Sequence, residues 1–338
     1  MNLANSTLKD PRISLRNGVS LAAIGLLLGM IFSGILWGAV AVSWQEIWQV
    51  LTGRTTGENY QIIYNIRLPR VLLGAMVGMN LALSGCVLQG IMRNPLADPG
   101  IIGVSAGAGL AAMIIMILLP EMTLLVPIAA FIGALLALCL VLVLAWNKGV
   151  QPLPMVLAGV AVAALLGGGM SLLMIFYSDR IQGTVNWMAG SLQGRSWNHI
   201  RMILPYTLLG TIGVAAASRY LNLLQLGDEV AKSLGTRVQA VRLGLIGLAA
   251  LLAASAVSVA GLLGFVGLVV PHITRMLLGS DFEYLMPCSA LFGAVTVVAA
   301  DMAARTVFSP VEVPVGIFMA FLGAPFFIYL LRKGMRQG

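Results

Sequence analysis

Arginines near the ends of apolar segments are the side chains of this sequence best placed to bind a charged partner. Arg67 and Arg70 stand in the run RLPR, and Arg305 follows Asp301 by four residues. A guanidinium can bind a carboxylate through two parallel hydrogen bonds, so these arginines could capture acidic groups. The alternative interpretation is that each long side chain only reaches from a helix end to the membrane interface. The spacing of Asp301 and Arg305 predicts an ion pair along one helix, which favours a structural role for Asp301 over a proton relay.

Patterns for catalysis or metal binding are scarce by comparison. No stretch reads GxxxxGK followed by serine or threonine, so the loop that cradles ATP phosphates is missing, and HExxH is missing as well. His272 has no histidine, cysteine or carboxylate at helical spacing within its segment 264–279, whereas a metal site needs several converging ligands. We therefore predict no catalytic residue, no metal site and no cofactor in this chain. For His272 we predict a capping or inter-helix hydrogen-bonding role.

The composition places these residues in a membrane. Hydrophobic residues make up 59% and charged residues 9% of the 338 residues, and the mean hydropathy is +0.96. Soluble domains carry roughly a quarter charged residues. A membrane-crossing helix needs about 20 mostly apolar residues. We predict ten spans, with nine as the alternative because 240–278 is nearly continuous: 19–41, 68–91, 101–119, 124–146, 153–177, 202–218, 240–262, 263–279, 285–304 and 314–331.

The lysines and arginines of the loops predict the orientation. With ten spans, 13 of the 20 basic residues fall on one side, and the positive-inside rule makes that side cytoplasmic. Both termini are then cytoplasmic, with tails 1–18 and 332–338 around a single transmembrane domain, 19–331. This bias explains the net charge of +8, so we expect no nucleic-acid partner. The first apolar run is too long for a cleavable signal peptide and is expected to remain as a span.

The run NPLADPG interrupts an apolar stretch. Pro95 and Pro99 each remove a backbone donor and disfavour helical geometry in the preceding residues, Asn94 and Asp98, so the chain must turn here. Pro271 breaks a later apolar stretch in the same way. We assign these residues to the structure and gating of a path through the membrane, in a set that comprises Asn94, Pro95, Asp98, Pro99, Pro271, His272 and Asp301.

Four runs of the sequence resemble the FecCD family, the permease subunits of ABC importers for iron-siderophores, haem and cobalamin. The resemblance implies an all-α polytopic permease in the bacterial cytoplasmic membrane. It also implies a second permease subunit, identical or homologous, two cytoplasmic ATPases that bind ATP and Mg²⁺, and an extracytoplasmic substrate-binding protein. The four runs are RLPR (67–70), NPLADPGIIGVSAGA (94–108), LGDEVAKSLG (226–235) and GFVGLVVPHITRMLLG (264–279).

The same resemblance assigns two contact surfaces. Arg67, Arg70 and Arg305 match arginines that contact glutamates on the two lobes of the binding protein. The segment 219–242 matches the coupling segment, whose short helices sit in a cleft of the ATPase. The residues alone also allow a solvated connector, with a helix that ends at a glycine. The expected ATPase contacts are Asp228, Glu229, Ala231, Ser233, Leu234 and Gly235.

Residues 67–108 and 237–278 suggest a faint internal repeat, because each begins with arginine, continues through an apolar span and breaks at glycine and proline. The two copies lie five spans apart, so they would be inverted in the membrane. We expect residues 155–194 and the tenth span to line the path. Ferric siderophore is the expected cargo, with haem and cobalamin as alternatives. An ion-coupled secondary transporter is the alternative from another class, and the scarcity of intramembrane charge disfavours it.

Overall fold

The computed structural model describes residues 12–38, 40, 42–53, 58–147 and 149–335. Every named secondary-structure element within these residues is a helix. Predictions for residues 1–11, Arg54, Lys148 and residues 336–338 lie outside the described residues. Ten apolar helices occupy the ten predicted segments: α1 (Arg12–Leu36), α4 (Leu68–Met92), α5 (Val104–Leu118), α6 (Val126–Ala145), α7 (Pro152–Phe176), α9 (Trp197–Ala216), α12 (Val238–Ala260), α13 (Val266–Leu278), α14 (Phe282–Thr306) and α15 (Val315–Met335).

Seven of the described helical stretches are long and apolar enough to cross a membrane. Three others, α5, α13 and the residues Val315–Tyr329 of α15, are apolar but shorter. Ten is therefore an approximate count of full crossings. α1 begins at Arg12 and α15 continues to Met335, so both predicted tails are partly helical.

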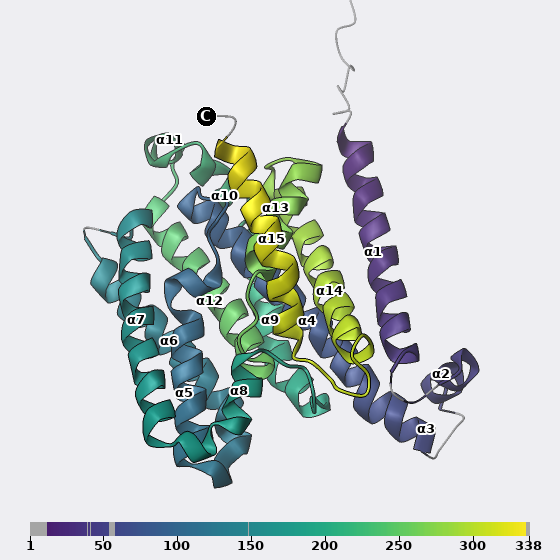
Figure 1. Cartoon of the computed structure of the whole chain (residues 1–338). Helices are drawn as coiled ribbons and strands as arrows, with labels where there is room; N and C mark the ends of the chain where they lie inside the picture. The colour runs from purple at the N-terminus through teal and green to yellow at the C-terminus, as the bar shows by residue number, and fades with distance from the viewer. Residues whose placement is uncertain (1–11, 39, 41, 54–57, 148, 336–338) are drawn as a thin grey trace, which may run out of the picture.

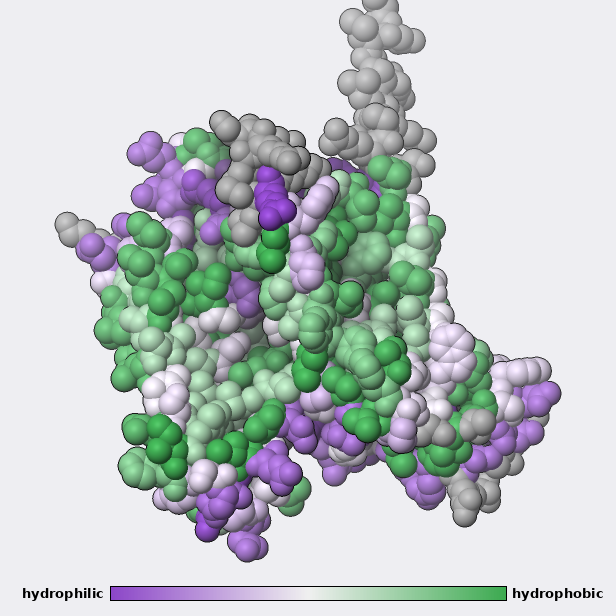
Figure 2. All heavy atoms as spheres, viewed as in Figure 1, coloured by the Kyte–Doolittle hydropathy of each residue, from purple (hydrophilic) through white to green (hydrophobic). Residues whose placement is uncertain are grey.

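The molecule has two polar ends and an apolar belt. Figure 2 shows hydrophobic residues spread across the middle of this face, with hydrophilic residues gathered above and below. α1 begins and α15 ends at one end of the molecule, together with α10 (Ser218–Gln225) and α11 (Asp228–Ser233) (Figure 1). α2 (Trp44–Leu51) and α3 (Glu58–Tyr60) lie at the opposite end. We refer to these as the α11 end and the α2 end.

Helix α4 is the packing centre because small residues let other helices approach its backbone. A Cβ atom on Gly78 would overlap the carbonyl of Gly293 in α14, and one on Gly293 would overlap the carbonyl of Gly78. Gly85 lies in the same way against the carbonyl of Gly267 in α13. Close approach of this kind provides van der Waals packing, which helices in lipid need because apolar burial alone gives no advantage there.

The predicted turn at NPLADPG is confirmed. α4 ends where Arg93 adopts a left-handed conformation with φ 47°. Asp98 then accepts a hydrogen bond from the Gly100 amide at 2.8 Å and caps the short helix η2 (Pro99–Ile102). Gly103, with φ 79°, leads into α5. A proline cannot continue the preceding helix and a capped turn satisfies the freed backbone groups, so the chain re-enters the helix bundle here.

The second predicted break, between α12 and α13, also separates a long helix from a shorter one. α12 ends before Gly261, and Phe265, with φ 67°, precedes the shorter helix α13. Arg93, the first residue after α4, and Arg242, in the second turn of α12, both bind the carboxylate of Asp228. The end of α4 and the start of α12 therefore lie at the same end of the molecule. α4 and α12 therefore run in opposite directions, as an inverted repeat predicts.

A non-helical segment at 189–194 lies between the end of α12 and the start of α15. The Ser191 amide donates to the Ala260 carbonyl at 2.8 Å, and the Gly316 amide donates to the Gly190 carbonyl at 3.1 Å. Gly190 has φ 76°, a conformation open to glycine without strain. This segment connects three elements of the expected path, whose lining remains a prediction.

Candidate functional site

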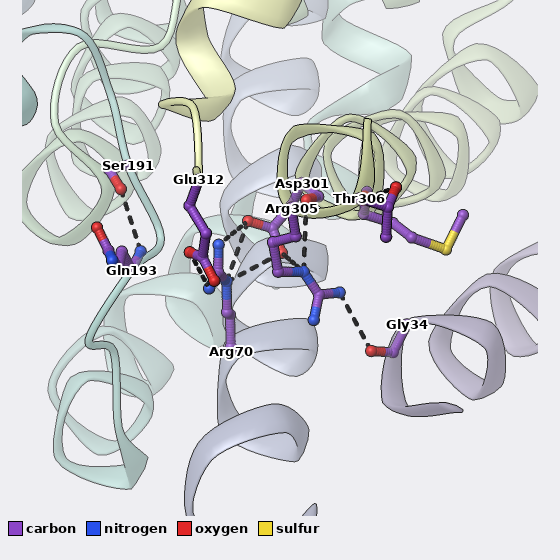
Figure 3. Close-up of polar contacts among 9 residues, drawn as sticks. Gly34, Arg70, Ser191, Gln193, Asp301, Arg305, Thr306 and Glu312 are labelled. Carbon is purple, nitrogen blue, oxygen red and sulfur yellow. Dashed lines mark hydrogen bonds and ion pairs between the residues drawn. The ribbon is translucent and has the colours of Figure 1, made fainter. Parts of the chain in front are cut away.

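Arg70 forms the centre of an arginine cluster near the α2 end, which comprises the buried residues Arg67, Arg70, Asp301 and Arg305 and the exposed Glu312. Figure 3 shows all of them except Arg67. Arg70 lies in the first turn of α4. Its Nε donates to both carboxylate oxygens of Asp301 at 3.1 and 3.2 Å, and its Nη2 donates to Asp301 Oδ1 at 2.9 Å. Its Nη1 donates to Glu312 Oε2 at 2.9 Å. The Asp301 side chain is 3% exposed, so this ion pair is shielded from water and salt.

The predicted pair of Asp301 and Arg305 is confirmed. Arg305 Nε lies 3.2 Å from Asp301 Oδ2, and Arg305 Nη2 donates to the Gly34 carbonyl of α1 at 3.1 Å. Asp301 thus serves two arginines on two helices, α4 and α14. This supports the structural role that its spacing predicts, because one carboxylate joins both guanidinium groups.

Arg67 ends the wide helical turn η1 (Gln61–Arg67) and reaches the end of α1. It donates to the carbonyls of Ile35 and Leu36 at 2.8 and 2.9 Å, and to the carbonyl of Val40. These carbonyls have no partner in the next helical turn, and a cation near them is favourable. Arg67 therefore closes the C-terminal end of α1.

The three arginines predicted to contact a binding protein are not exposed at the surface. Arg67, Arg70 and Arg305 are 5%, 8% and 7% exposed. The alternative, that each side chain only extends to the membrane interface, does not hold either, because each guanidinium binds carbonyl or carboxylate groups inside the chain. Docking of a partner at these arginines stays a prediction, and it requires that some of these bonds are exchanged.

An open depression lies beside the cluster at the α2 end. Its volume is about 810 Å³, and Arg305 lies in its wall with Trp37, Trp44 and the backbone around Gly38. Ser43 caps α2 through a reciprocal pair of hydrogen bonds with Glu46. The bond from the Ser43 amide, followed by that from its hydroxyl, lowers the pKa of Glu46, so this carboxylate is ionised at the surface.

At the α11 end, Asp228 fixes the surface helices. Arg242 of α12, whose side chain is 2% exposed, donates to both oxygens of Asp228 at 2.9 and 3.0 Å and to the Val150 carbonyl at 3.0 Å. Arg93 also donates to Asp228. Asp228 was expected to contact an ATPase. In the structure it instead anchors α11 to α12 and to the end of α4.

The exposed face of the surface helices is apolar. Leu226, Val230 and Leu234 follow one another at intervals of four residues and are 59%, 46% and 59% exposed. Leu226 is the C-cap residue of α10, Gly227 separates it from α11, and Val230 and Leu234 lie in α11 and at its C-terminal end. We refer to these three exposed residues as the apolar stripe. Ala231 is fully buried, so its predicted contact with an ATPase, which stays a prediction, requires that the packing of α11 changes. The other predicted contacts that are exposed are Glu229, Ser233, Leu234 and Gly235.

The predicted end of α11 at Gly235 is confirmed. Gly235 has φ 81°, its amide donates to the Lys232 carbonyl at 2.9 Å, and the Thr236 amide donates to the Ala231 carbonyl at 3.0 Å. This pair of bonds is a Schellman motif, which satisfies the last carbonyls of a helix. The described ion pairs of Asp228 are with arginines and not with Lys232, which is four residues away.

The residues assigned to gating have backbone roles. Asn94 Oδ1 accepts from the Leu96 amide at 2.9 Å and tightens the turn that Pro95 begins. Pro99 is the first residue of η2, where a proline costs no hydrogen bond.

Pro271 lies inside α13, which continues to Leu278, so the predicted break at this proline is wrong and the chain breaks earlier, between Gly261 and Phe265. The Nδ1 of His272 is buried without a described hydrogen-bond partner. The predicted hydrogen bond of His272 is therefore not found within the described residues.

One catalytic pattern fits the sequence but not the fold. The run GVSAG (103–107) has the GxSxG spacing of a nucleophile elbow. Such an elbow places the serine between a strand and a helix. Here η2 and Gly103 precede Ser105, which lies in the first turns of α5. This run gives no support to an enzymatic role.

The fold and its two ends define a polytopic transport permease, with paired inverted helices between an arginine cluster and an amphipathic surface helix. The model of the FecCD transport family matches residues 26–333, and the chain belongs to this family. It is 40% identical over 318 residues to the Fe(3+)-citrate import system permease protein YfmE of Bacillus subtilis, covering 94% of this chain and 95% of that protein.

Two further comparisons agree with this membership. The cobalamin import system permease protein BtuC of Halobacterium salinarum is 41% identical over 304 residues, which cover 90% of this chain and 81% of that protein. A solved structure assigned to the metal-chelate type of ABC transporter, in an inward-facing conformation, has a TM-score of 0.84 at 30% identity. The match covers 94% of this chain and 99% of the other. The chain is thus a permease subunit of a metal-chelate type ABC importer.

Several residues of both surfaces escape sequence reasoning. Glu312, Arg93 and Arg242 each bind a predicted residue from a distant part of the chain, and no local spacing indicates these pairs. Leu226 and Val230 could have been found, because LGDEVAKSL places apolar residues at four-residue intervals next to charges.

Proposed function

We propose that this permease carries a ferric siderophore across the bacterial cytoplasmic membrane, as one of two permease subunits around a shared path. An extracytoplasmic binding protein delivers the cargo at the α2 end. Two cytoplasmic ATPases, which bind ATP and Mg²⁺, act at the α11 end. The observation that carries this proposal is the exposed apolar stripe at Leu226, Val230 and Leu234, on a surface segment that Asp228 anchors to the buried Arg242.

The stripe fits a cleft on a soluble partner. The segment of α10 and α11 that carries Leu226, Val230 and Leu234 lies at a polar end of the molecule and not in its apolar belt (Figures 1 and 2), so lipid tails do not cover it. Exposed apolar groups rimmed by polar residues are typical of protein contacts. Asp228 and Arg242 connect α11 to α12, so a movement of an ATPase can be passed on as a rigid-body displacement.

The arginine cluster supports docking of an acidic partner at the other end. Its three arginines outnumber its two carboxylates, and Arg305 lies in the wall of the open depression. A partner glutamate entering that depression could reach the guanidinium group. The approach of an acidic partner through the open depression weakens as salt rises, since a Debye length is about 8 Å at physiological ionic strength.

Ferric siderophore is proposed over haem and cobalamin because several relatives are permeases for ferric chelates, among them YfmE for iron citrate and FhuG of Bacillus subtilis for iron hydroxamate. Relatives with cobalamin as cargo share the same fold, so the cargo must be tested on the binding protein. We expect the binding protein that co-purifies with this permease to bind ferric hydroxamates or catecholates. Tight binding of haem or cobalamin, with no binding of ferric chelates, would overturn the choice of cargo.

The docking arm is tested by Arg305→Lys in permease–ATPase complexes reconstituted in nanodiscs. Lysine keeps the charge and loses the planar fork, so we expect binding of the cognate binding protein to weaken several-fold. Arg219→Lys at the opposite end, whose side chain is 85% exposed, is the matched control and should change nothing. If the native permease, Arg305→Lys and Arg219→Lys all bind the binding protein equally well, docking does not occur at Arg305.

A further inference from the structure

The segment 307–314 between α14 and α15 carries one carboxylate to the arginine cluster. Glu312 accepts the hydrogen bond from Arg70 Nη1, and its side chain is 32% exposed, compared with 3% for Asp301. Val307 and Val311 of the same segment are 61% and 65% exposed. Glu312 is therefore the outermost member of the cluster, on a segment that faces away from the helix packing.

The two edges of the Arg70 guanidinium have different partners. Nε and Nη2 form the inner edge and bind Asp301, which Arg305 also holds. Nη1 forms the outer edge and points to Glu312 (Figure 3). The inner edge is fixed by a buried carboxylate with a second cation beside it. The outer edge meets a carboxylate that water already reaches.

The segment with Glu312 leads directly into the centre of the molecule. The Val313 amide donates to the Ala304 carbonyl at 3.2 Å, and Val315, three residues after Glu312, is 1% exposed. Gly316 binds the Gly190 carbonyl and lies against the carbonyls of residues 189 and 262. A displacement at Glu312 therefore acts next to the start of α15 and the segment 189–194.

We propose that Glu312 occupies the outer edge of Arg70 in the free permease, and that a carboxylate of the docking protein displaces it and releases segment 307–314. The inference rests on the proposed docking function. It explains how an arginine with both edges occupied can still bind a partner. One carboxylate replaces another on Nη1, so Arg70 keeps the same number of ion pairs while Asp301 holds its orientation.

The first test measures the dissociation constant of the cognate binding protein for permease–ATPase complexes in nanodiscs. Glu312→Gln removes the competing charge, so we expect docking to become roughly three- to five-fold tighter, the upper part of the range of a partly exposed ion pair. Glu46→Gln is the matched control, because it removes the same charge at the same end and Glu46 contacts Ser43 and Asn59 instead of the cluster. It should leave docking within two-fold of the native value.

The second test follows the segment itself with a spin label on Val311→Cys. Cys139 is exposed and is replaced by serine, whereas Cys86 and Cys288 are buried. In the native background the label should gain mobility when the binding protein docks. In Glu312→Gln it should be mobile before docking and gain little afterwards.

Tighter docking and early mobility in Glu312→Gln support the displacement. Docking that weakens in Arg305→Lys but is unchanged or weaker in Glu312→Gln overturns the displacement and leaves the docking function intact. If neither Arg305→Lys nor Glu312→Gln changes docking, both the displacement of Glu312 and the docking function are overturned. A label whose mobility is the same with and without the binding protein overturns the release of the segment.

Discussion

The apolar stripe at the α11 end gives a quantitative prediction for ATPase binding. Leu226 and Leu234 are each 59% exposed and follow the last residues of α10 and α11, whereas Leu224 of α10 and Ala231 of α11 are buried. We predict that the double substitution Leu226→Ser and Leu234→Ser weakens binding of the ATPase subunit. Because both side chains face solvent in the permease, the substitutions should leave its fold unchanged.

The expected magnitude follows from the exposed fraction of each side chain. Full burial of a leucine side chain contributes about 1.5–3 kcal/mol. With somewhat more than half of each side chain still to be buried, each leucine contributes about 1 kcal/mol to the contact. The two together contribute about 2 kcal/mol, which corresponds to roughly a 30-fold increase in the dissociation constant.

The assay titrates purified ATPase onto the permease in nanodiscs and measures binding by biolayer interferometry. Lys232→Ser is the matched control, since it shortens an exposed side chain of α11 without removing apolar surface from the stripe. It should change the dissociation constant less than about three-fold. If the double variant binds as tightly as the native chain, the stripe is not the ATPase contact.

Three further predictions concern the elements that hold these surfaces. Asp301→Asn leaves the buried Arg70 and Arg305 without their shared carboxylate, so the free energy of unfolding should fall by about 3–5 kcal/mol. Thermal unfolding in detergent measures this change, and an unfolding midpoint equal to that of the native protein would contradict it. Gly293→Leu drives a side chain into the α4 backbone and should prevent recovery of folded protein by size exclusion, whereas Gly244→Ala, which has open space, should behave as native. Asp228→Asn loosens α11 from Arg242 and should lower ATP-driven transport more than ATPase binding; an equal loss of both would argue against a role in transmission.

The sequence predicts the helices and their breaks well, because these depend on local chemistry. Length and apolar character locate ten helices, proline with glycine locates the turn after α4, and glycine alone locates the turn after α12. The end of α11 at Gly235 is predictable for the same reason, since only a residue free of a Cβ enters the left-handed region without strain. The lengths of α5 and α13 are not predictable in this way. The hydropathy pattern assigns residues 101–103 and 263–265 to these two spans, whereas in the structure they belong to the turns that precede the helices.

The candidate sites are predicted as residue types and not as environments. RLPR indicates arginines at a helix start, yet their burial depends on Asp301 and Glu312, which lie more than 200 residues away. Ala231 illustrates the same limit at the other end, since the pattern assigns it to a contact surface and tertiary packing buries it. The pairing of Asp228 with Arg242 depends on α12 lying beneath the surface helices, which no local spacing specifies.

The central claim is that this permease moves a ferric chelate only together with an ATPase and a binding protein. Uptake of a radiolabelled ferric siderophore into proteoliposomes tests it most directly, with the permease, the ATPase and the binding protein each left out in turn. The account predicts uptake that requires all three proteins and hydrolysable ATP. Uptake by the permease alone, driven by a proton or sodium gradient, would contradict it.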